Sequence, residues 1–178
     1  MKTDNSHLKQ KVELRIKYLP DKTKIKVLDC FAGKGTIWRQ VKKESDKQIQ
    51  IISIEKEKGK NKSALEGDNV KYLLSMDLTK FDIIDLDAYG IPFEQLEILF
   101  KRNYKGIVFI TAIQSIIGKI PNGLLIKLGY TQKMINKIPS LFNRNGIEKV
   151  KNYLYLCGIE YIKGYFIGRK NYFVINIK

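Results

Sequence analysis

The sequence of 178 residues is poor in the side chains that build metal centres and disulfide frameworks. It contains two cysteines, Cys30 and Cys157, and a single histidine, His7. Two cysteines do not make the disulfide network of a small secreted domain, and this usage favours a reducing cytoplasm. One histidine near the N-terminus supports neither a histidine-based catalytic triad nor a metal site. We therefore expect a cytoplasmic protein that binds no metal.

Long hydrophobic runs are also missing. No apolar segment approaches the roughly 20 residues that a membrane-spanning helix needs, and Met1 to Gln10 lacks the apolar core of a signal peptide. Hydrophobic residues still make up 44% of the chain and charged residues 29%, a balance typical of globular proteins. With no internal repeat, residues 1–178 are expected to form a single domain that has no membrane partner.

Acidic residues are scarce relative to basic ones. The chain has 18 Asp and Glu against 33 Lys and Arg, which leaves a formal net charge of +15. Such a surface attracts polyanions, and nucleic acid is the leading candidate. The chain is also rich in Lys, Ile, Asn and Tyr together, as expected from an AT-rich genome, and this codon bias is the competing explanation of the charge.

A glycine-rich turn between a predicted strand and a predicted helix is the most informative motif, in the run VLDCFAGKGT. Asp29 ends the strand, and Gly33 and Gly35 let the backbone approach a nucleotide-like ligand because glycine has no side chain. A phosphate-binding loop would need Ser or Thr directly after Lys34, and a dinucleotide fingerprint would need Gly or Ala where Trp38 stands. Neither common nucleotide motif is therefore present.

The turn Asp-x-Phe-Ala-Gly-x-Gly-Thr resembles motif I of the class I S-adenosylmethionine-dependent methyltransferases, in the form seen in nucleic-acid enzymes. Glu55 lies twenty residues beyond Gly35, where nucleotide-binding α/β proteins place an acid on the ribose hydroxyls. Asp68 follows a weak third strand, where the methyltransferase pattern has an acceptor for the adenine amine, and it is also suited to cap a helix. The resemblance implies S-adenosylmethionine as cofactor, bound by Asp29, Phe31, Ala32, Gly33, Gly35, Thr36, Glu55, Asp68, Asn69 and Asp85.

A second motif, FDIIDLDAYGIP, spans residues 81–92. Asp87 stands two residues before Tyr89, and Gly90 permits the turn. An exocyclic base amine is a poor nucleophile because its lone pair is delocalised into the ring. A carboxylate that accepts its hydrogens would localise that pair and receive the proton, while a facing aromatic ring would hold the base plane. We therefore predict Asp87 and Tyr89 as catalytic residues of methyl transfer to such an amine.

Together with GIVFITA at residues 106–112, this motif resembles the tRNA guanosine N2-dimethyltransferase family. That family carries Asp-x-Asp-Pro-Tyr/Phe-Gly-Ser-Pro, followed by a strand that ends in Thr-Ala. The resemblance covers roughly residues 26–112 and implies tRNA processing by transfer to the 2-amino group of guanine, with Asp87 accepting from the amine and Tyr89 beside the base. Two departures are visible: Ala88 replaces the proline, and the sequence does not include the family's large C-terminal RNA-binding domain.

Alternating apolar segments predict an α/β fold. The expected sheet is Rossmann-like, seven-stranded and mostly parallel, with helices on both faces and a C-terminal antiparallel hairpin. Apolar residues recur at nearly helical spacing near the N-terminus, with Lys11 and Arg15 among the basic residues between them. An amphipathic helix within residues 1–20 is therefore expected to pack on this domain, with these cations on its polar side. The predicted strands are residues 25–29, 48–54, 63–67, 83–86, 105–112, 159–167 and 172–177, and the predicted helices are residues 8–19, 36–43, 70–76, 147–157 and a segment from residue 93.

Residues 113–145 form an irregular segment in which basic and aromatic side chains are interleaved. Such a mixture is what a surface needs to track a nucleic-acid backbone and stack on its bases. A solvated crossover connection would have the same composition. We take the segment as a candidate for substrate recognition, and the expected substrate-binding residues are Gly90, Lys119, Lys127, Tyr130 and Lys133.

Several functions stay compatible with the sequence. RNA is favoured over DNA, but Asp87-Ala88-Tyr89 is also similar to the Asp-Pro-Pro-Tyr element of DNA amino-methyltransferases. A non-catalytic nucleic-acid-binding module that retains the fold and a small-molecule methyltransferase are further alternatives. Carbon-5 methylation of pyrimidines is disfavoured, because that chemistry needs a nucleophilic cysteine near the fourth strand.

Overall fold

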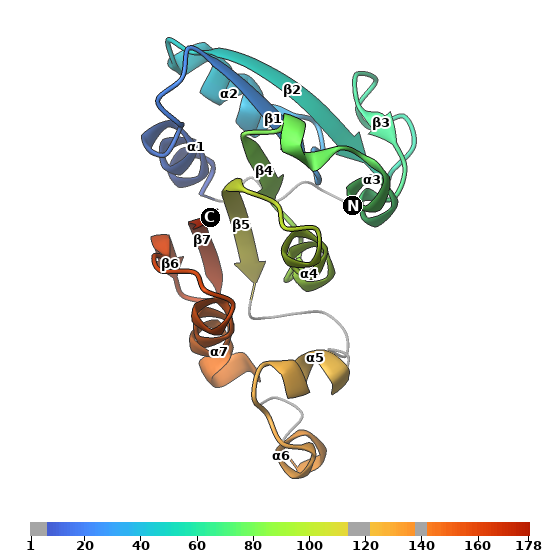
Figure 1. The fold of residues 1–178 in the computed structure, drawn as a ribbon, viewed down its shortest axis with the longest axis vertical. Helices are drawn as coiled ribbons and strands as arrows, with labels where there is room; N and C mark the ends of the chain where they lie inside the picture. The colour runs from blue at the N-terminus through green and yellow to red at the C-terminus, as the bar shows by residue number, and fades with distance from the viewer. Residues whose placement is uncertain (1–6, 114–121, 138–141) are drawn as a thin grey trace.

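Seven strands form one sheet in the computed structural model, which describes residues 7–113, 122–137 and 142–178 (Figure 1). The strand order is β3-β2-β1-β4-β5-β7-β6. Neighbouring strands are parallel except that β7 runs antiparallel to both β5 and β6. The predicted fold class is therefore confirmed. The strands are β1 Lys24–Asp29, β2 Gln48–Glu55, β3 Leu65–Glu66, β4 Ile83–Leu86, β5 Gly106–Ile113, β6 Lys163–Ile167 and β7 Lys170–Ile177.

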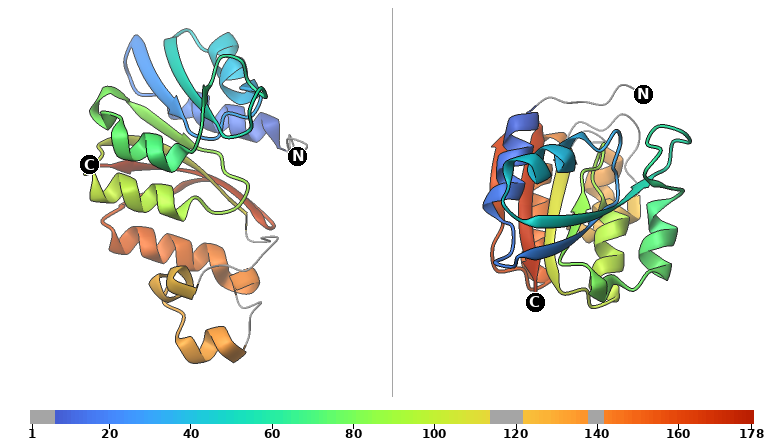
Figure 2. Two further views of the ribbon diagram at one scale, coloured as in Figure 1. Left: turned by 90° about the vertical axis from the view of Figure 1, so that its right-hand side faces the viewer. Right: turned by 90° about the horizontal axis from the view of Figure 1, so that it is seen from above.

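Helices cover both faces of the sheet (Figure 2). Two of them, α1 and α2, pack on one face, and α3, α4 and α7 pack on the other. The short helices α5 and α6 lie beyond α7, at the end of the molecule away from β2 (Figure 1). The helices are α1 Leu8–Lys17, α2 Thr36–Glu44, α3 Asn69–Ser75, the 3-10 turn η1 Leu78–Lys80, α4 Phe93–Lys101, α5 Asn122–Lys127, α6 Gln132–Lys137 and α7 Phe142–Leu156.

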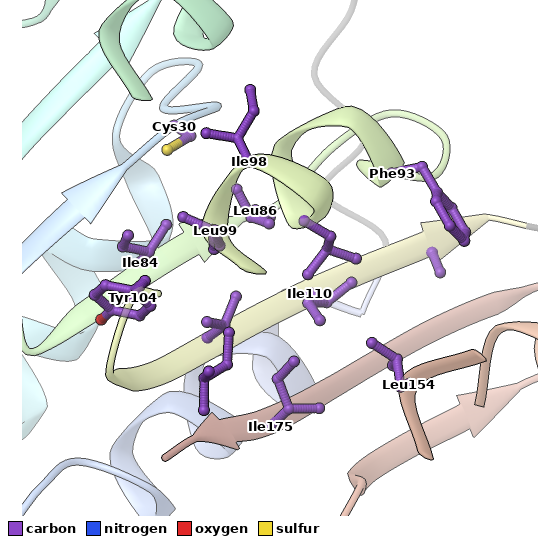
Figure 3. Close-up of a cluster of buried hydrophobic side chains, with 14 of the residues drawn as sticks. Cys30, Ile84, Leu86, Phe93, Ile98, Leu99, Tyr104, Ile110, Leu154 and Ile175 are labelled. Carbon is purple, nitrogen blue, oxygen red and sulfur yellow. The ribbon is translucent and has the colours of Figure 1, made fainter. Parts of the chain in front are cut away.

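Each face of the sheet carries its own hydrophobic core. On the α3, α4 and α7 side, Leu86, Leu99 and Leu154 are fully buried in one cluster (Figure 3). On the opposite side, Trp38 of α2 packs edge-on against Phe109 of β5, with 6.2 Å between ring centroids. Every residue of β4 is buried, as expected for a central parallel strand that is covered on both faces. The rigid centre of the sheet thus fixes where the ends of β1, β4 and β5 lie.

The segment 113–145 differs from its prediction as an irregular region. Within its described part it contains α5, α6 and the start of α7. Gly129 ends α5 with a φ of 82°, and its N–H donates to the carbonyl of Ile126 at 2.8 Å. A glycine in left-handed conformation just after a helix is a common C-terminal cap. Short helices with such caps have too little apolar periodicity to be recognised from the pattern alone.

Helix α1 forms where it was expected, but it buries an unexpected pair of side chains. Val12 and Leu14 are buried as apolar residues, while Lys11 and Arg15 are also buried, with 7% and 1% of their surface exposed. The prediction placed these two cations between the apolar positions, on the polar side of the helix. They are spaced by four residues and therefore share one side of α1, which faces the ends of the central strands.

Candidate active site

A cavity of about 400 Å³ opens at the carboxyl ends of the parallel strands, where open α/β sheets bind their ligands. Side chains from the ends of β1, β2, β4 and β5 line it, together with the loops that follow. Among the expected site residues, those that line the cavity are Asp29, Phe31, Ala32, Gly33, Thr36, Glu55, Asp68, Asn69, Asp85, Asp87 and Tyr89.

The glycine loop lies across the ends of β1 and β2. The N–H of Ala32 donates to the carbonyl of Ile54 at 3.1 Å, and the N–H of Gly35 donates to the carbonyl of Ala32 at 2.7 Å. Gly33 and Gly35 have φ values of 54° and 68°, which residues with a side chain rarely adopt. The glycines thus allow the tight turn that brings the start of α2 to the cavity.

Two polar groups lie at the cavity end formed by β2 and α3. Glu55 ends β2, and its Oε1 accepts from the N–H of Glu57 at 2.9 Å. Asp68 caps α3 by accepting from the N–H of Val70 at 2.9 Å, so the predicted capping role is confirmed. The other oxygen of Asp68 lies 3.8 Å from Lys56 Nζ, and its side chain is 41% exposed. Both residues line the cavity.

Asn69 contributes to the wall of the cavity through its own hydrogen bonds. Its Nδ2 donates to the carbonyl of Cys30 at 2.8 Å, and its Oδ1 accepts from Gln95 Nε2 at 2.8 Å. Both ends of the amide are thereby engaged with the protein. The residue ties the glycine loop to α3 and α4, and its predicted contact with a cofactor stays a prediction.

Three acids gather where β1 and β4 end, and one of them is locked by the fold itself. Asp85 is buried, and Arg15 of α1 donates to both of its oxygens at 2.7 Å. Trp38 Nε1 of α2 donates to Asp85 Oδ2 at 2.6 Å. Although Asp85 lines the cavity, its carboxylate already has three donors from this chain, and its expected role in holding a cofactor stays a prediction.

Burial and crowding of the acids shift their pKa values. Burial raises the pKa of Asp29 well above its ordinary value, and the neighbouring charge of Asp85 raises it further. Burial also raises the pKa of Asp85, against the opposing effect of Arg15. For Arg15, burial acts to lower the pKa, but the charge of Asp85 and the hydrogen bonds to it outweigh burial and raise the pKa overall. Asp29 is the acid of the three without a direct cationic partner among the described residues.

Asp87 follows β4 and has partners on two sides. Lys11 Nζ of α1 lies 2.8 Å from both of its oxygens, and the hydroxyl of Thr111 of β5 donates to Oδ1. The side chains of Lys11 and Asp87 are 9% and 14% exposed, and both line the cavity. The predicted catalytic acid is thus held in place by a helix and a strand that lie on either side of it.

The turn after Asp87 presents its aromatic ring to solvent at the mouth of the cavity. Tyr89 is 57% exposed, while Ala88 is 7% exposed and buried beneath the turn. Gly90 has a φ of 138°, and its carbonyl accepts from the N–H of Ile113 at 2.9 Å. The backbone at Gly90 therefore anchors the turn to the end of β5, and the ring of Tyr89 is free to meet a ligand.

Among the described residues of the segment 113–145, the expected substrate-binding residues Lys127, Tyr130 and Lys133 do not line the cavity. Lys127 and Lys133 are exposed on α5 and α6, and Lys127 pairs with Glu97 of α4. Tyr130 is 2% exposed and lies in the hydrophobic core, so its ring is not displayed for stacking as the interleaved pattern predicted. Lys119 lies outside the described residues. Recognition of a substrate by this segment stays a prediction.

The sequence pattern missed the contribution of α1 to the site. Lys11 and Arg15 supply the cations that hold Asp87 and Asp85, and Arg15 Nη1 also donates to the carbonyl of Lys11 at 2.9 Å. The sequence does carry a signal for this role, because two cations spaced by four residues lie on an otherwise apolar side of the helix and need buried partners there.

Within the described residues, no cluster of three or more His, Cys, Asp or Glu side chains could hold a metal ion, and no helix is long and apolar enough to span a membrane.

The burial of Asp29 predicts how the free energy of unfolding depends on pH. Its folded-state pKa lies above the ordinary value of 3.8, so its contribution to stability is complete below that value and is lost as the pH rises through the folded-state pKa. We expect Asp29→Asn to raise the free energy of unfolding at neutral pH by about 0.5–2 kcal/mol, with the gain vanishing at acidic pH. Urea unfolding across this pH range measures it.

Asp46→Asn is the matched control for this experiment, because Asp46 is exposed at the end of α2. It should leave both the stability and its pH dependence unchanged. If the free energy of unfolding of Asp29→Asn equalled that of the wild type at every pH, burial of the ionised Asp29 carboxyl would not destabilise the protein.

Comparison with known proteins supports the fold. No family model matches the chain, and no curated protein matches it. Among solved structures, a SAM-dependent methyltransferase from Archaeoglobus fulgidus is 14% identical with a TM-score of 0.55, covering 93% of this chain and 92% of that one. The Escherichia coli protein yhhF, assigned as a methyltransferase, is 12% identical with a TM-score of 0.55, covering 100% of this chain and 88% of its own.

Two further structures extend the comparison. A protein from Methanococcus maripaludis, assigned as an S-adenosyl-L-methionine-dependent methyltransferase, is 14% identical with a TM-score of 0.54, covering 97% of this chain and 88% of its own. PigF, solved with SAH, is 12% identical with a TM-score of 0.52, and the match covers 98% of this chain and 56% of PigF. Identity this low establishes a common fold. The chain has the Rossmann-like fold that is found in class I S-adenosylmethionine-dependent methyltransferases.

Proposed function

We propose that the protein is a cytoplasmic methyltransferase that uses S-adenosylmethionine and acts on an exocyclic amine of a base in RNA. The observation that carries the proposal is the convergence of the glycine loop, Glu55, Asp68 and Asp87 on one cavity. These residues were selected from separate motifs along the chain, and parallel α/β sheets bind nucleotide-like ligands at this edge. The fold shared with SAM-dependent methyltransferases supports the same assignment.

The carboxylates that line the cavity suit this cofactor. S-adenosylmethionine supplies a methyl group on a positively charged sulfonium. Glu55 would accept from the ribose hydroxyls and Asp68 from the adenine amine, in line with the position of both residues on the cavity wall. Asp29, whose negative charge has no direct cationic partner among the described residues, would be stabilised by a cationic ligand. The protein thereby provides a polar end for the adenosyl group and an acidic end for the positive charge.

We assign Asp87 and Tyr89 to the acceptor side of the reaction. Asp87 would accept a hydrogen from the amine, which localises the nitrogen lone pair, and would take up the proton that is released. The exposed ring of Tyr89 would hold the base plane at the cavity mouth. Because in-line displacement depends mainly on positioning, the rigid anchoring of Asp87 by α1 and β5 is the main contribution of the fold.

An RNA substrate is supported by charge. The chain carries a net charge of +15, and Lys34, Lys56 and Lys60 line the same cavity. Lysines beside a base pocket can contact the phosphates of the strand that carries the base. The resemblance to tRNA guanosine N2-dimethyltransferases makes the 2-amino group of guanine the first target to examine.

The proposal is tested by incubating the purified protein with methyl-labelled S-adenosylmethionine and total cellular RNA, followed by nucleoside analysis. We expect label in one amine-methylated nucleoside. Genomic DNA and a small-molecule extract are assayed in parallel. Label in DNA alone would favour a DNA amino-methyltransferase. Label in small molecules alone would favour a small-molecule methyltransferase, and the net positive charge of the chain would then be explained by codon bias. An absence of transfer to all three would contradict the proposed activity.

Glu55→Ala is expected to weaken the binding of S-adenosylmethionine. Hydrogen bonds to charged groups are worth about 1.5–3 kcal/mol, so the Kd should rise roughly tenfold to a hundredfold. Isothermal titration calorimetry measures the change. Glu44→Ala removes the same charge at the end of α2, outside this cavity, and should bind like the wild type. Equal Kd values for Glu55→Ala and the wild type would remove Glu55 from the cofactor site.

A further inference from the structure

Lys11 and Asp87 form a charge pair that is open to the acceptor side of the cavity. Lys11 Nζ lies 2.8 Å from Oδ1 and 2.8 Å from Oδ2 of Asp87, and its ammonium lies 5.2 Å from the ring centroid of Tyr172. Both partners line the cavity. A ligand group that reaches Asp87 must therefore also meet Lys11.

The hydrogen-bonding capacity of Asp87 is only partly used by the protein. A carboxylate oxygen has two lone-pair sites. Oδ1 accepts from the hydroxyl of Thr111, and Oδ2 accepts from the ammonium of Lys11. One acceptor site thus stays open on each oxygen, and the site on Oδ2 lies beside the ammonium. An ammonium has three N–H donors, so the hydrogen bond to Asp87 leaves a donor beside that acceptor.

The pair therefore displays one acceptor next to one donor. Its complement is an amino group with a ring nitrogen that carries no hydrogen beside it. Guanine has this arrangement at its amine and N3, and adenine and cytosine have it at their amines and adjacent ring nitrogens. The opposite side of guanine places a ring N–H beside the amine, which would turn a donor toward the Lys11 ammonium.

We propose that Lys11 is a specificity-determining residue that donates a hydrogen bond to the acceptor ring nitrogen adjacent to the methylated amine. The inference rests on the proposed function and names the base edge that the site reads. Asp87 accepts from the amine, and Lys11 excludes bases or orientations that present two donors. Buried polar groups that lose their partner discriminate strongly against the wrong ligand.

The backbone of Lys11 is fixed before any ligand arrives. Arg15 Nη1 donates to the carbonyl of Lys11 at 2.9 Å, and the same guanidinium is held by Asp85 through two contacts of 2.7 Å. Recognition groups need such support from neighbouring residues to keep their geometry. The ion pair of Arg15 with Asp85 thereby sets the position of Lys11 opposite Asp87.

The test uses RNA oligonucleotides that carry either the target base identified by nucleoside analysis or its deaza analogue, in which CH replaces the adjacent ring nitrogen. Equilibrium binding is measured by fluorescence anisotropy without cofactor, and kcat/KM is measured with it. For the wild type, the analogue should bind and react roughly tenfold to a hundredfold less well, as expected for loss of a charged hydrogen bond. Lys11→Met should treat the normal base and the analogue alike.

Lys9→Met is the matched control, because Lys9 is on the same helix with its side chain 84% exposed. It should discriminate between the two bases as the wild type does. A wild type that binds and methylates the analogue as well as the normal base would overturn the inference, as would a Lys11→Met variant that keeps full discrimination. Either result would leave the methyltransferase activity standing, whereas failure of the proposed function would appear as no transfer to the normal base. The comparison of the normal base with its analogue uses the wild-type protein, so it does not depend on whether Lys11→Met folds.

Discussion

Arg15→Met is expected to lower the free energy of unfolding by about 3–5 kcal/mol, because it leaves the carboxylate of Asp85 buried without its cation. Arg15 and Asp85 are each 1% exposed, and Arg15 donates to both oxygens of Asp85 at 2.7 Å. Trp38 would be the remaining donor to that carboxylate. Globular domains have about 5–15 kcal/mol of total stability, so the loss should be visible in urea unfolding as a large shift of the midpoint.

Two further variants separate this charge effect from a loss of packing. In the double variant Arg15→Met with Asp85→Asn, the buried group is neutral and can still accept from Trp38, so much of the lost stability should return. Lys17→Met removes an exposed cation from the same helix and should change stability by no more than about 0.5 kcal/mol. If the double variant were as unstable as Arg15→Met alone, the loss would come from packing and not from the unpaired charge.

Asp87→Ala is expected to reduce methyl transfer by about 10²–10⁴-fold, the usual contribution of a positioned general base. Binding of S-adenosylmethionine should be retained, since Asp87 lies on the acceptor side of the cavity and its oxygens face Lys11 and Thr111. Single-turnover transfer to RNA and calorimetry of cofactor binding measure the two quantities separately. The expected signature is therefore a loss of kcat with little change in the cofactor Kd.

Asp87→Asn is a second variant that separates the loss of the catalytic carboxylate from a loss of structure. The amide keeps an oxygen for Lys11 and Thr111 but cannot take up the proton of the amine, so transfer should again be slow. Asp46→Ala, at an exposed acid outside the cavity, should react like the wild type. Transfer by Asp87→Ala at the wild-type rate would show that Asp87 is not the catalytic acid.

The fold was predictable because the buried strands have an unambiguous pattern. Ile83 to Leu86 forms a short apolar run, and the structure buries it on both faces. The glycine loop and the C-terminal hairpin were predictable from their glycines, although the turn is shorter than expected, since β7 already begins at Lys170. The short helices α5 and α6 were missed, because six residues carry too little periodicity to distinguish a helix from a loop.

The site was predictable only in part. Residues next to strand ends, such as Glu55 and Asp87, could be placed together because parallel strands end at one edge of the sheet. The role of α1 could not be read in the same way. Lysine and arginine usually lie on the surface, so Lys11 and Arg15 were assigned to the polar side of the helix. Only the packed structure shows that three crowded acids draw both cations inward.

The cofactor site is tested most directly by isothermal titration calorimetry of the wild-type protein with S-adenosylmethionine. We expect saturable binding at one site per chain, because the glycine loop, Glu55 and Asp68 line a single cavity beside the acid Asp29. An absence of measurable binding by folded protein would contradict the assignment of this cavity to the cofactor, and with it the methyltransferase function.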